Sequence, residues 1–350
     1  MDYSKIKPSK ILATLSLTVA IIFLLSSWEP LTYKRDSFLP LKNSTAKSMV
    51  SSEKDELEVA LEKASMANKT VIIAIINKAY VEPNDDEYPS MFDLFLEGFW
   101  VGEDTRPLLT HLVVVSMDTT AHERCLFRRL NCYRLAAEGD GFAGEKVYMS
   151  PEFIEMMWRR TYFLVQVLKR GYSFIFTDSD ILWLRNPLAR LVKDESVDLH
   201  ISTDTYKGDA SSTSRNPINT GFYFVKSSNK TTSLFERWYD TRKNSTGMKE
   251  QDVLVKLVRH GVLTELGIKA RVLDTLYFSG FCRDSRDVRS VATVHANCCR
   301  GIRAKVVDLK AVLRDWKRFR EEERVSTNAT NNFRWSKHVS CSNSWRQGAS

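Results

Sequence analysis

The chain of 350 residues, 43% of them hydrophobic, is long enough to bury the core of one large domain with appended segments. Its formal net charge of +8 comes from basic residues that are scattered among acids, as in residues 314–324. This distribution is typical of a solvated helix surface and not of a basic nucleic-acid-binding stripe, so we expect no nucleic-acid partner.

The N-terminus predicts a membrane anchor. Residues 11–28 carry no charge and reach the length of a bilayer span, with lysines before them and an acid after them. This charge distribution places residues 1–10 in the cytosol as a short tail. A cleaved signal peptide is the alternative, but no Ala-x-Ala-like site follows, which favours an uncleaved anchor. Residues 29–68, rich in Ser, Lys, Glu and Thr, are predicted to form a stem, with a short helix over 52–66.

Glycosylation sequons and cysteines all lie beyond this anchor. The Asn-x-Ser/Thr sequences begin at Asn43, Asn68, Asn229, Asn244 and Asn328. In an oxidising compartment some of the 6 cysteines should form disulfides, although the sequence leaves their connectivity open. The adjacent Cys298 and Cys299 are expected to pair elsewhere and not with each other. A zinc site is the alternative, but no pair of Cys-x-x-Cys spacings favours it. The pattern indicates a lumenal, membrane-anchored glycoprotein.

Strands and helices alternate over residues 69–320, the predicted catalytic domain. Apolar runs bounded by polar residues predict strands at 70–76, 111–115, 174–176, 199–203, 221–225, 271–274 and 291–294. Helical spacing and capping residues predict helices at 91–100, 151–170, 233–240 and 250–259. Strands that alternate with helices in this way predict a parallel α/β sheet. Residues 321–350 are expected to form a C-terminal tail.

Two carboxylates, Asp178 and Asp180, directly follow the strand at 174–176. Open α/β sheets bind their ligands at this end of a strand, and two close carboxylates repel unless a cation lies between them. One chemistry that uses such a pair is the binding of Mn²⁺ or Mg²⁺ together with the diphosphate of a nucleotide sugar. Another is that of a phosphatase of the haloacid-dehalogenase type, with Asp178 as nucleophile and Asp180 as acid/base. A third possibility is that the pair only caps the strand.

Longer motifs decide between these chemistries. The segments 145–150, 157–160, 171–187, 219–225, 250–252 and 293–299 resemble, in the same order, the plant nucleotide-diphospho-sugar transferase family. This family includes rhamnogalacturonan-II xylosyltransferases and extensin arabinosyltransferases. The resemblance runs from about residue 70 to 316, and its departures, at Asn186 and Ile181-Leu182, are minor. It implies a GT-A-type fold, with a Rossmann-like, mostly parallel sheet and flanking helices. It also implies type II topology in the Golgi membrane, a UDP-sugar donor and retention of anomeric configuration.

The same resemblance assigns the metal ligands. Asp178 and Asp180 match the family's metal and diphosphate motif, and His295 resembles the late histidine that completes the metal shell in related retaining enzymes. A neutral imidazole together with two carboxylates and phosphate oxygens suits an octahedral Mn²⁺ site. Without the resemblance, a lone histidine at a strand end would be interpreted as structural.

Other candidates are placed by their position in the chain. Asn77, Lys78 and Asp118 follow the first two strands, where a nucleotide would lie, although such residues commonly only form turns. Arg160 precedes the metal strand and is predicted to reach a phosphate, with a surface ion pair as the alternative.

Three residues are candidates for the sugar side of the site. Asn219 is predicted to face the donor sugar. Gln251 and Asp252 open a helix, where capping is the alternative role, and one of them is predicted to face the anomeric carbon. Asp252 is the best candidate for the base that an inverting enzyme would need. We therefore expect a transferase that moves a sugar, a pentose in preference, to a cell-wall polysaccharide or glycoprotein. A phosphatase and a catalytically silent carbohydrate-binding protein are the alternatives.

Overall fold

The computed structural model describes residues 54–83, 87–135, 142–191, 194–325 and 333–346. The predicted cytosolic tail and membrane anchor lie outside the described residues, as does most of the predicted stem. Within the described part of the chain, no helix is both long enough and apolar enough to cross a bilayer.

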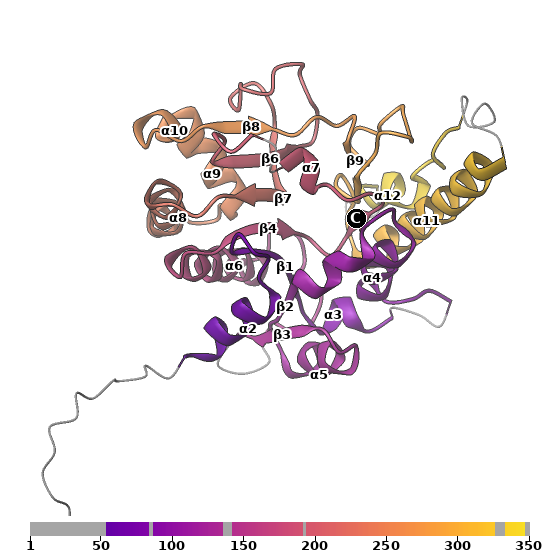
Figure 1. The fold of residues 1–350 in the computed structure, drawn as a ribbon, viewed down its shortest axis with the longest axis horizontal. Helices are drawn as coiled ribbons and strands as arrows, with labels where there is room; N and C mark the ends of the chain where they lie inside the picture. Colours follow the sequence, from indigo (N-terminus) through magenta and orange to yellow (C-terminus); the bar gives the residue numbers. More distant parts are fainter. Residues whose placement is uncertain (1–53, 84–86, 136–141, 192–193, 326–332, 347–350) are drawn as a thin grey trace, which may run out of the picture. The chain divides into compact units, whose positions relative to one another are not determined.

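A central sheet, seven-stranded within the described residues, has the strand order β3-β2-β1-β4-β7-β6-β8, which Figure 1 shows from bottom to top. Its strands are β1 (Thr70–Ile76), β2 (Leu112–Ser116), β3 (Asn131–Arg134), β4 (Ser173–Thr177), β6 (Leu199–Thr203), β7 (Ile218–Val225) and β8 (Ala270–Val272). Only β7 runs antiparallel to its neighbours, β4 and β6. The predicted mostly parallel α/β sheet is therefore confirmed.

Helices cover both faces of this sheet. Along β1, Val71 and Ile73 pack into one hydrophobic core, while Ile72 and Ala74 pack into another on the opposite face. Because both faces are buried, the strand is apolar throughout, which is why its range could be predicted. The first face carries α2 (Glu56–Ala64), α6 (Pro151–Lys169), α8 (Asn229–Thr241), α9 (Glu250–Arg259) and α10 (Val262–Glu265). The second carries α4 (Met91–Val101), α5 (Thr119–Phe127), η1 (Arg106–His111) and α7 (Leu188–Leu191).

A small sheet of three strands among the described residues joins distant parts of the chain. It consists of β5 (Ile181–Trp183), β10 (Thr293–His295) and β9 (Phe278–Gly280), in the order β5-β10-β9. Strand β10 runs antiparallel to β5, with His295 opposite Ile181. This register brings His295 beside the residue that precedes β5, Asp180.

Two boundaries differ from the predicted domain limits. Helix α2 lies inside the predicted stem, but its Leu57, Leu61 and Ala64 are buried in the core with α6, so the folded unit already includes this helix. At the other end, α11 (Ile302–Val325) and α12 (Val339–Ser344) occupy part of the predicted tail. Apolar residues at helical spacing account for α2, since they bury one face of it. Helix α12 is instead held by Cys341, through its disulfide to Cys299 and its amide hydrogen bond to Asp308. The remaining short helices are α3 (Lys78–Val81) and η2 (Arg242–Asn244).

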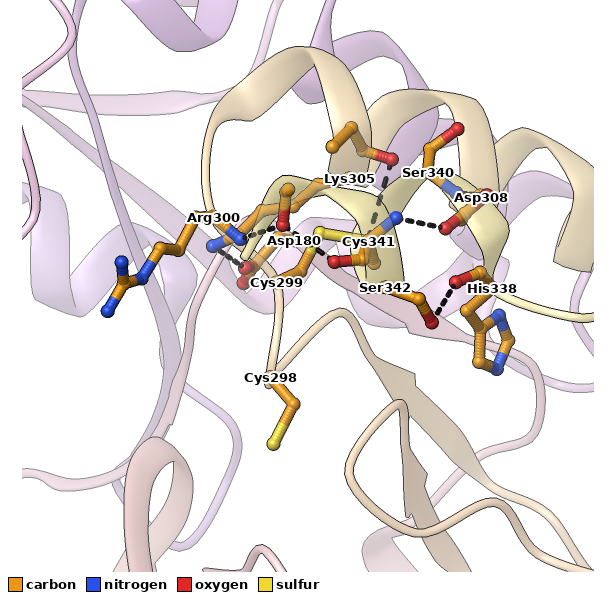
Figure 2. Close-up of a disulfide and its surroundings, with 12 residues drawn as sticks. Asp180, Cys298, Cys299, Arg300, Lys305, Asp308, His338, Ser340, Cys341 and Ser342 are labelled. Atoms are coloured by element: carbon orange, nitrogen blue, oxygen red, sulfur yellow. Dashed lines mark hydrogen bonds and ion pairs between the residues drawn. A yellow bond between two sulfur atoms is a disulfide. The ribbon is translucent and has the colours of Figure 1, made fainter. Parts of the chain in front are cut away.

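All 6 cysteines form disulfides. Cys125 pairs with Cys132, Cys282 with Cys298, and Cys299 with Cys341. The adjacent Cys298 and Cys299 thus pair elsewhere, as predicted. The third disulfide connects the segment before α11 to α12 (Figure 2).

Candidate active site

Three potential metal ligands meet beyond the end of β4. Asp178 follows β4, Asp180 precedes β5, and His295 ends β10, and one ligand atom from each lies within 4.8 Å of the others. Asp180 Oδ1 lies 3.3 Å from His295 Nε2, and this buried oxygen accepts no hydrogen bond from the residues that the structure describes. Two carboxylates and an imidazole form a donor set that Mn²⁺ and Mg²⁺ accept, and a cation would satisfy the unpaired oxygen. The residues therefore fit a divalent metal.

Gly221 of β7 keeps the space among these ligands open. A Cβ atom on this residue would lie 2.4 Å from His295 Cε1 and 2.8 Å from Asp178 Oδ2. The Gly221 carbonyl also accepts a hydrogen bond of 2.7 Å from the Asp178 amide, which fixes the aspartate backbone. Only glycine fits at this point of close approach.

A largely buried cation contacts each aspartate. Arg160 on α6 donates to Asp178 Oδ1 at 2.8 Å and to Glu250 Oε1 at 2.5 Å. Lys305 in the first turns of α11 donates to Asp180 Oδ2 at 2.7 Å. Because these charged groups are removed from water, each one depends on the opposite charge of its partner. Loss of either member of a pair would leave an uncompensated buried charge.

The two aspartates differ in acidity because their surroundings differ. Burial raises the pKa of Asp178 to about 6, and the Arg160 guanidinium only partly offsets this effect. Burial acts in the same direction on Asp180, but the Lys305 ammonium and His295 outweigh it and hold the pKa of Asp180 below its ordinary value. For His295, burial opposes the charged form, yet Asp180 raises its pKa above the ordinary value.

Asp178 and Asp180 line a cavity of about 310 Å³ at the carboxyl edge of the sheet. Of the residues predicted for the site, Asn77, Arg160, Asn219 and Gln251 line it as well. Its walls come from the ends of β1 and β2, from α6, from β7 and the start of α9, and from the segment that leads into α11. The open α/β sheet thus has its cavity where such sheets bind ligands.

The residues predicted to contact a nucleotide separate into two groups. The Asn77 amide lines the cavity and donates to the Phe142 carbonyl at 2.6 Å, and its buried Oδ1 has no hydrogen-bond partner among the described residues. Asp118 and Lys78 lie outside the cavity lining. Asp118 accepts hydrogen bonds from the amides of Ala121 and Lys78, so both of its oxygens stabilise the backbone.

Of the three residues predicted for the sugar side, two line the cavity and one does not. Asn219 donates to Asp204 Oδ1 at 2.9 Å, and Gln251 Oε1 accepts from the Thr220 amide at 3.1 Å, so both are held in place at the cavity wall. Asp252 does not line the cavity, and burial raises its pKa above the ordinary value.

Several residues of the cavity were not predicted from the sequence. Glu250, beside the predicted Gln251, is the buried partner of Arg160 and also accepts from Thr220 Oγ1 at 2.9 Å. Lys305 was not predicted because one lysine in a charged helix has no distinguishing local pattern. The remaining unpredicted polar or aromatic lining residues are Tyr80, Tyr148, Phe153, Ser179, Asp204, Thr220, Lys249, Asn297, Arg300 and Trp345. The signal that could have identified Lys305 is not local: it is the position of this lysine at the start of a helix shortly after His295.

This fold and site agree with what comparison to known proteins shows. A family model described as nucleotide-diphospho-sugar transferase matches residues 107–309, which is more than half of the chain. The chain belongs to this family of nucleotide-diphospho-sugar transferases, and it is a glycosyltransferase.

Relatives and solved structures are similar over much of the chain. An uncharacterized protein of Arabidopsis thaliana is 53% identical over 293 residues, 83% of this chain and 84% of that protein. A beta-arabinofuranosyltransferase of Arabidopsis thaliana is 23% identical over 202 residues, 56% of this chain and 34% of that protein. A solved glycosyltransferase involved in the glycosylation of the major capsid of PBCV-1 matches 69% of this chain and 98% of its own, at 15% identity and a TM-score of 0.40.

Proposed function

We propose that the chain transfers a pentose, such as xylose or arabinose, from a UDP-sugar to a cell-wall polysaccharide or glycoprotein. The observation that carries this proposal is the cluster of Asp178, Asp180 and His295 around Gly221, beside a cavity at the carboxyl edge of the sheet. Family membership supports a nucleotide-sugar donor. The relative that is a beta-arabinofuranosyltransferase supports a pentose.

In this proposal Asp178, Asp180 and His295 would hold Mn²⁺ or Mg²⁺. A bound cation would supply positive charge against the negative charge that develops on a departing diphosphate. Arg160 orients Asp178, and Lys305 orients Asp180 and adds a positive charge at the same place. The end of β1 with Asn77, and Met117 after β2, offer a surface for the uridine.

Retention of anomeric configuration is the stereochemistry that the site favours. An inverting transferase needs a carboxylate base within reach of the acceptor hydroxyl. Asp252, the predicted base, lies outside the cavity lining. The lining carboxylates are already engaged, Glu250 by Arg160 and Thr220, and Asp204 by the amides of Asn219 and Asn297. We also propose that the protein is a type II Golgi membrane protein with a lumenal catalytic domain. The three disulfides, which form in oxidising compartments, support this location.

The donor is tested by incubating the purified full chain with a panel of UDP-pentoses and UDP-hexoses in Mn²⁺ and measuring release of UDP. We expect the highest kcat/KM with a UDP-pentose. A preference for a UDP-hexose would refute the choice of pentose. Release of phosphate from simple phosphate esters, with a trapped aspartyl phosphate on Asp178, would instead indicate phosphatase chemistry.

A further inference from the structure

Two aromatic side chains and two cations lie together on the wall of the active-site cavity. Tyr148 and Trp345 are 45% and 44% exposed, so their rings are accessible to a ligand. The Arg300 guanidinium lies 4.0 Å from the ring centroid of Trp345 and 5.6 Å from that of Tyr148. Lys249 Nζ lies 5.2 Å from the Tyr148 centroid and donates to its hydroxyl at 3.2 Å. All four residues line the cavity that contains Asp178 and Asp180.

Among the described residues, no carboxylate pairs with the two cations of this cluster. Within the described ranges, neither Lys249 nor Arg300 lies within 4.0 Å of an acidic oxygen, whereas Arg160 and Lys305 in the same cavity are both paired. The buried Nε of Arg300 also has no hydrogen-bond partner in the part of the chain that the structure describes. Cations that line a cavity without an internal counter-ion attract an anionic group of a ligand, and a guanidinium binds a carboxylate through two parallel hydrogen bonds.

The C-terminal segment fixes this part of the wall. Trp345 Nε1 donates to the Cys298 carbonyl at 2.7 Å, and the Arg300 amide donates to Ser344 Oγ at 2.9 Å. Cys341 is bonded to Cys299, and its amide donates to Asp308 Oδ2 at 2.8 Å, as Figure 2 shows. These contacts hold the aromatic and guanidinium groups in position before a ligand binds, which reduces the entropy lost on binding.

We propose that Tyr148, Lys249, Arg300 and Trp345 form the acceptor subsite, and that the acceptor is a glycan that bears carboxylates, such as one built with uronic acids. The apolar face of a sugar ring packs on an exposed aromatic ring, and the two cations bind the carboxylate of the same or a neighbouring residue. Arg160, Lys305 and the metal site remain for the donor diphosphate. This inference rests on the proposed function, because an acceptor subsite requires a transferase.

The test compares binding of a galacturonic acid oligosaccharide and its carboxyl-reduced, neutral form to the full chain by calorimetry at low salt. Wild type should bind the acidic form about tenfold more tightly, the effect of one charge-assisted contact. Arg300→Met should largely abolish this preference, while Arg300→Lys should retain part of it. Arg346→Met is the control, because Arg346 is an exposed neighbour that does not line the cavity, and it should bind like wild type.

Two results would overturn the proposal. One is equal binding of the acidic and neutral oligosaccharides by wild type. The other is an Arg300→Met variant that keeps the acidic preference but has a raised KM for UDP-sugar hydrolysis without acceptor, which would assign these cations to the donor. Failure of the proposed function is seen separately, as a wild-type chain that hydrolyses no UDP-sugar, since the oligosaccharide affinities do not depend on that reaction.

Discussion

Gly221 shows how one residue determines whether the candidate metal site can exist. Asp178, His295 and Asn219 surround this glycine so closely that a methyl group would overlap all three. Their side chains are themselves fixed, His295 by strand pairing and Asn219 by its hydrogen bonds to Asp204 and to the Gly221 amide. These side chains therefore cannot make room for a methyl group unless Asp178 or His295 leaves its position as a candidate metal ligand.

The substitution Gly221→Ala should weaken Mn²⁺ binding by about tenfold or more, because the added Cβ displaces His295 or Asp178 from the ligand position. It should also lower the free energy of unfolding by about 1–3 kcal/mol, as overpacking does. Mn²⁺ binding can be followed by electron paramagnetic resonance. Gly144→Ala is the matched control, since a Cβ on Gly144 meets no atom within 4 Å. Wild-type Mn²⁺ affinity in Gly221→Ala would show that the metal lies elsewhere.

Among the elements, strand β6 contains a buried titratable group, His200, that does not line the candidate active-site cavity. His200 is 4% exposed and packs near Phe224, and its Nε2 has no hydrogen-bond partner within the described ranges. Burial lowers the pKa of His200 to about 4 from 6.5, so between these values the unfolded chain binds a proton that the folded chain does not. Its neutral state therefore favours folding fully above pH 6.5, and this contribution is lost as the pH falls toward 4.

Lowering the pH from 7 to 5 should consequently reduce the free energy of unfolding by about 2 kcal/mol through His200 alone. The measurement is urea denaturation of the full chain at both pH values with its disulfides intact. His200→Phe should have a smaller pH dependence than wild type, whereas replacement of the exposed His260 by Phe should not reduce it. An unchanged pH dependence in His200→Phe would show that the buried histidine is not responsible.

The elements also show what the sequence could and could not predict. Strand β1 has the predicted bounds, and Asp178 and Asp180 were predicted together, because both features depend on residues that are close in the chain. Strand β7 and helix α8 begin a few residues earlier in the structure than predicted. For α8 the reason is a capping box formed by Ser228 and Thr231, upstream of the predicted start. His295 was assigned through family resemblance. Its approach to Asp180 depends on the pairing of β5 with β10, a long-range contact that no local pattern specifies.

At the scale of the whole folded unit, the cavity is built from segments far apart in the sequence. The ends of β1 and β2 form one side, the Asp178–Asp180 loop lies at the centre, and the last wall comes from Arg300, Lys305 and Trp345. The Cys299–Cys341 disulfide joins this wall to α12, beyond the 107–309 segment that the family model matches. Long-range closure of this kind explains why Lys305 and Trp345 were missing from the predicted site.

The most direct test of the central claim, that Asp178, Asp180 and His295 support metal-dependent sugar transfer, is UDP-sugar hydrolysis by the full chain with and without excess chelator. We expect chelation to reduce the rate by about a hundredfold or more and added Mn²⁺ to restore it. Asp180→Asn should show a similar loss that Mn²⁺ does not restore, while Asp240→Asn, a change on the exposed part of α8, should behave like wild type. Full activity of the wild-type chain in excess chelator would contradict the account.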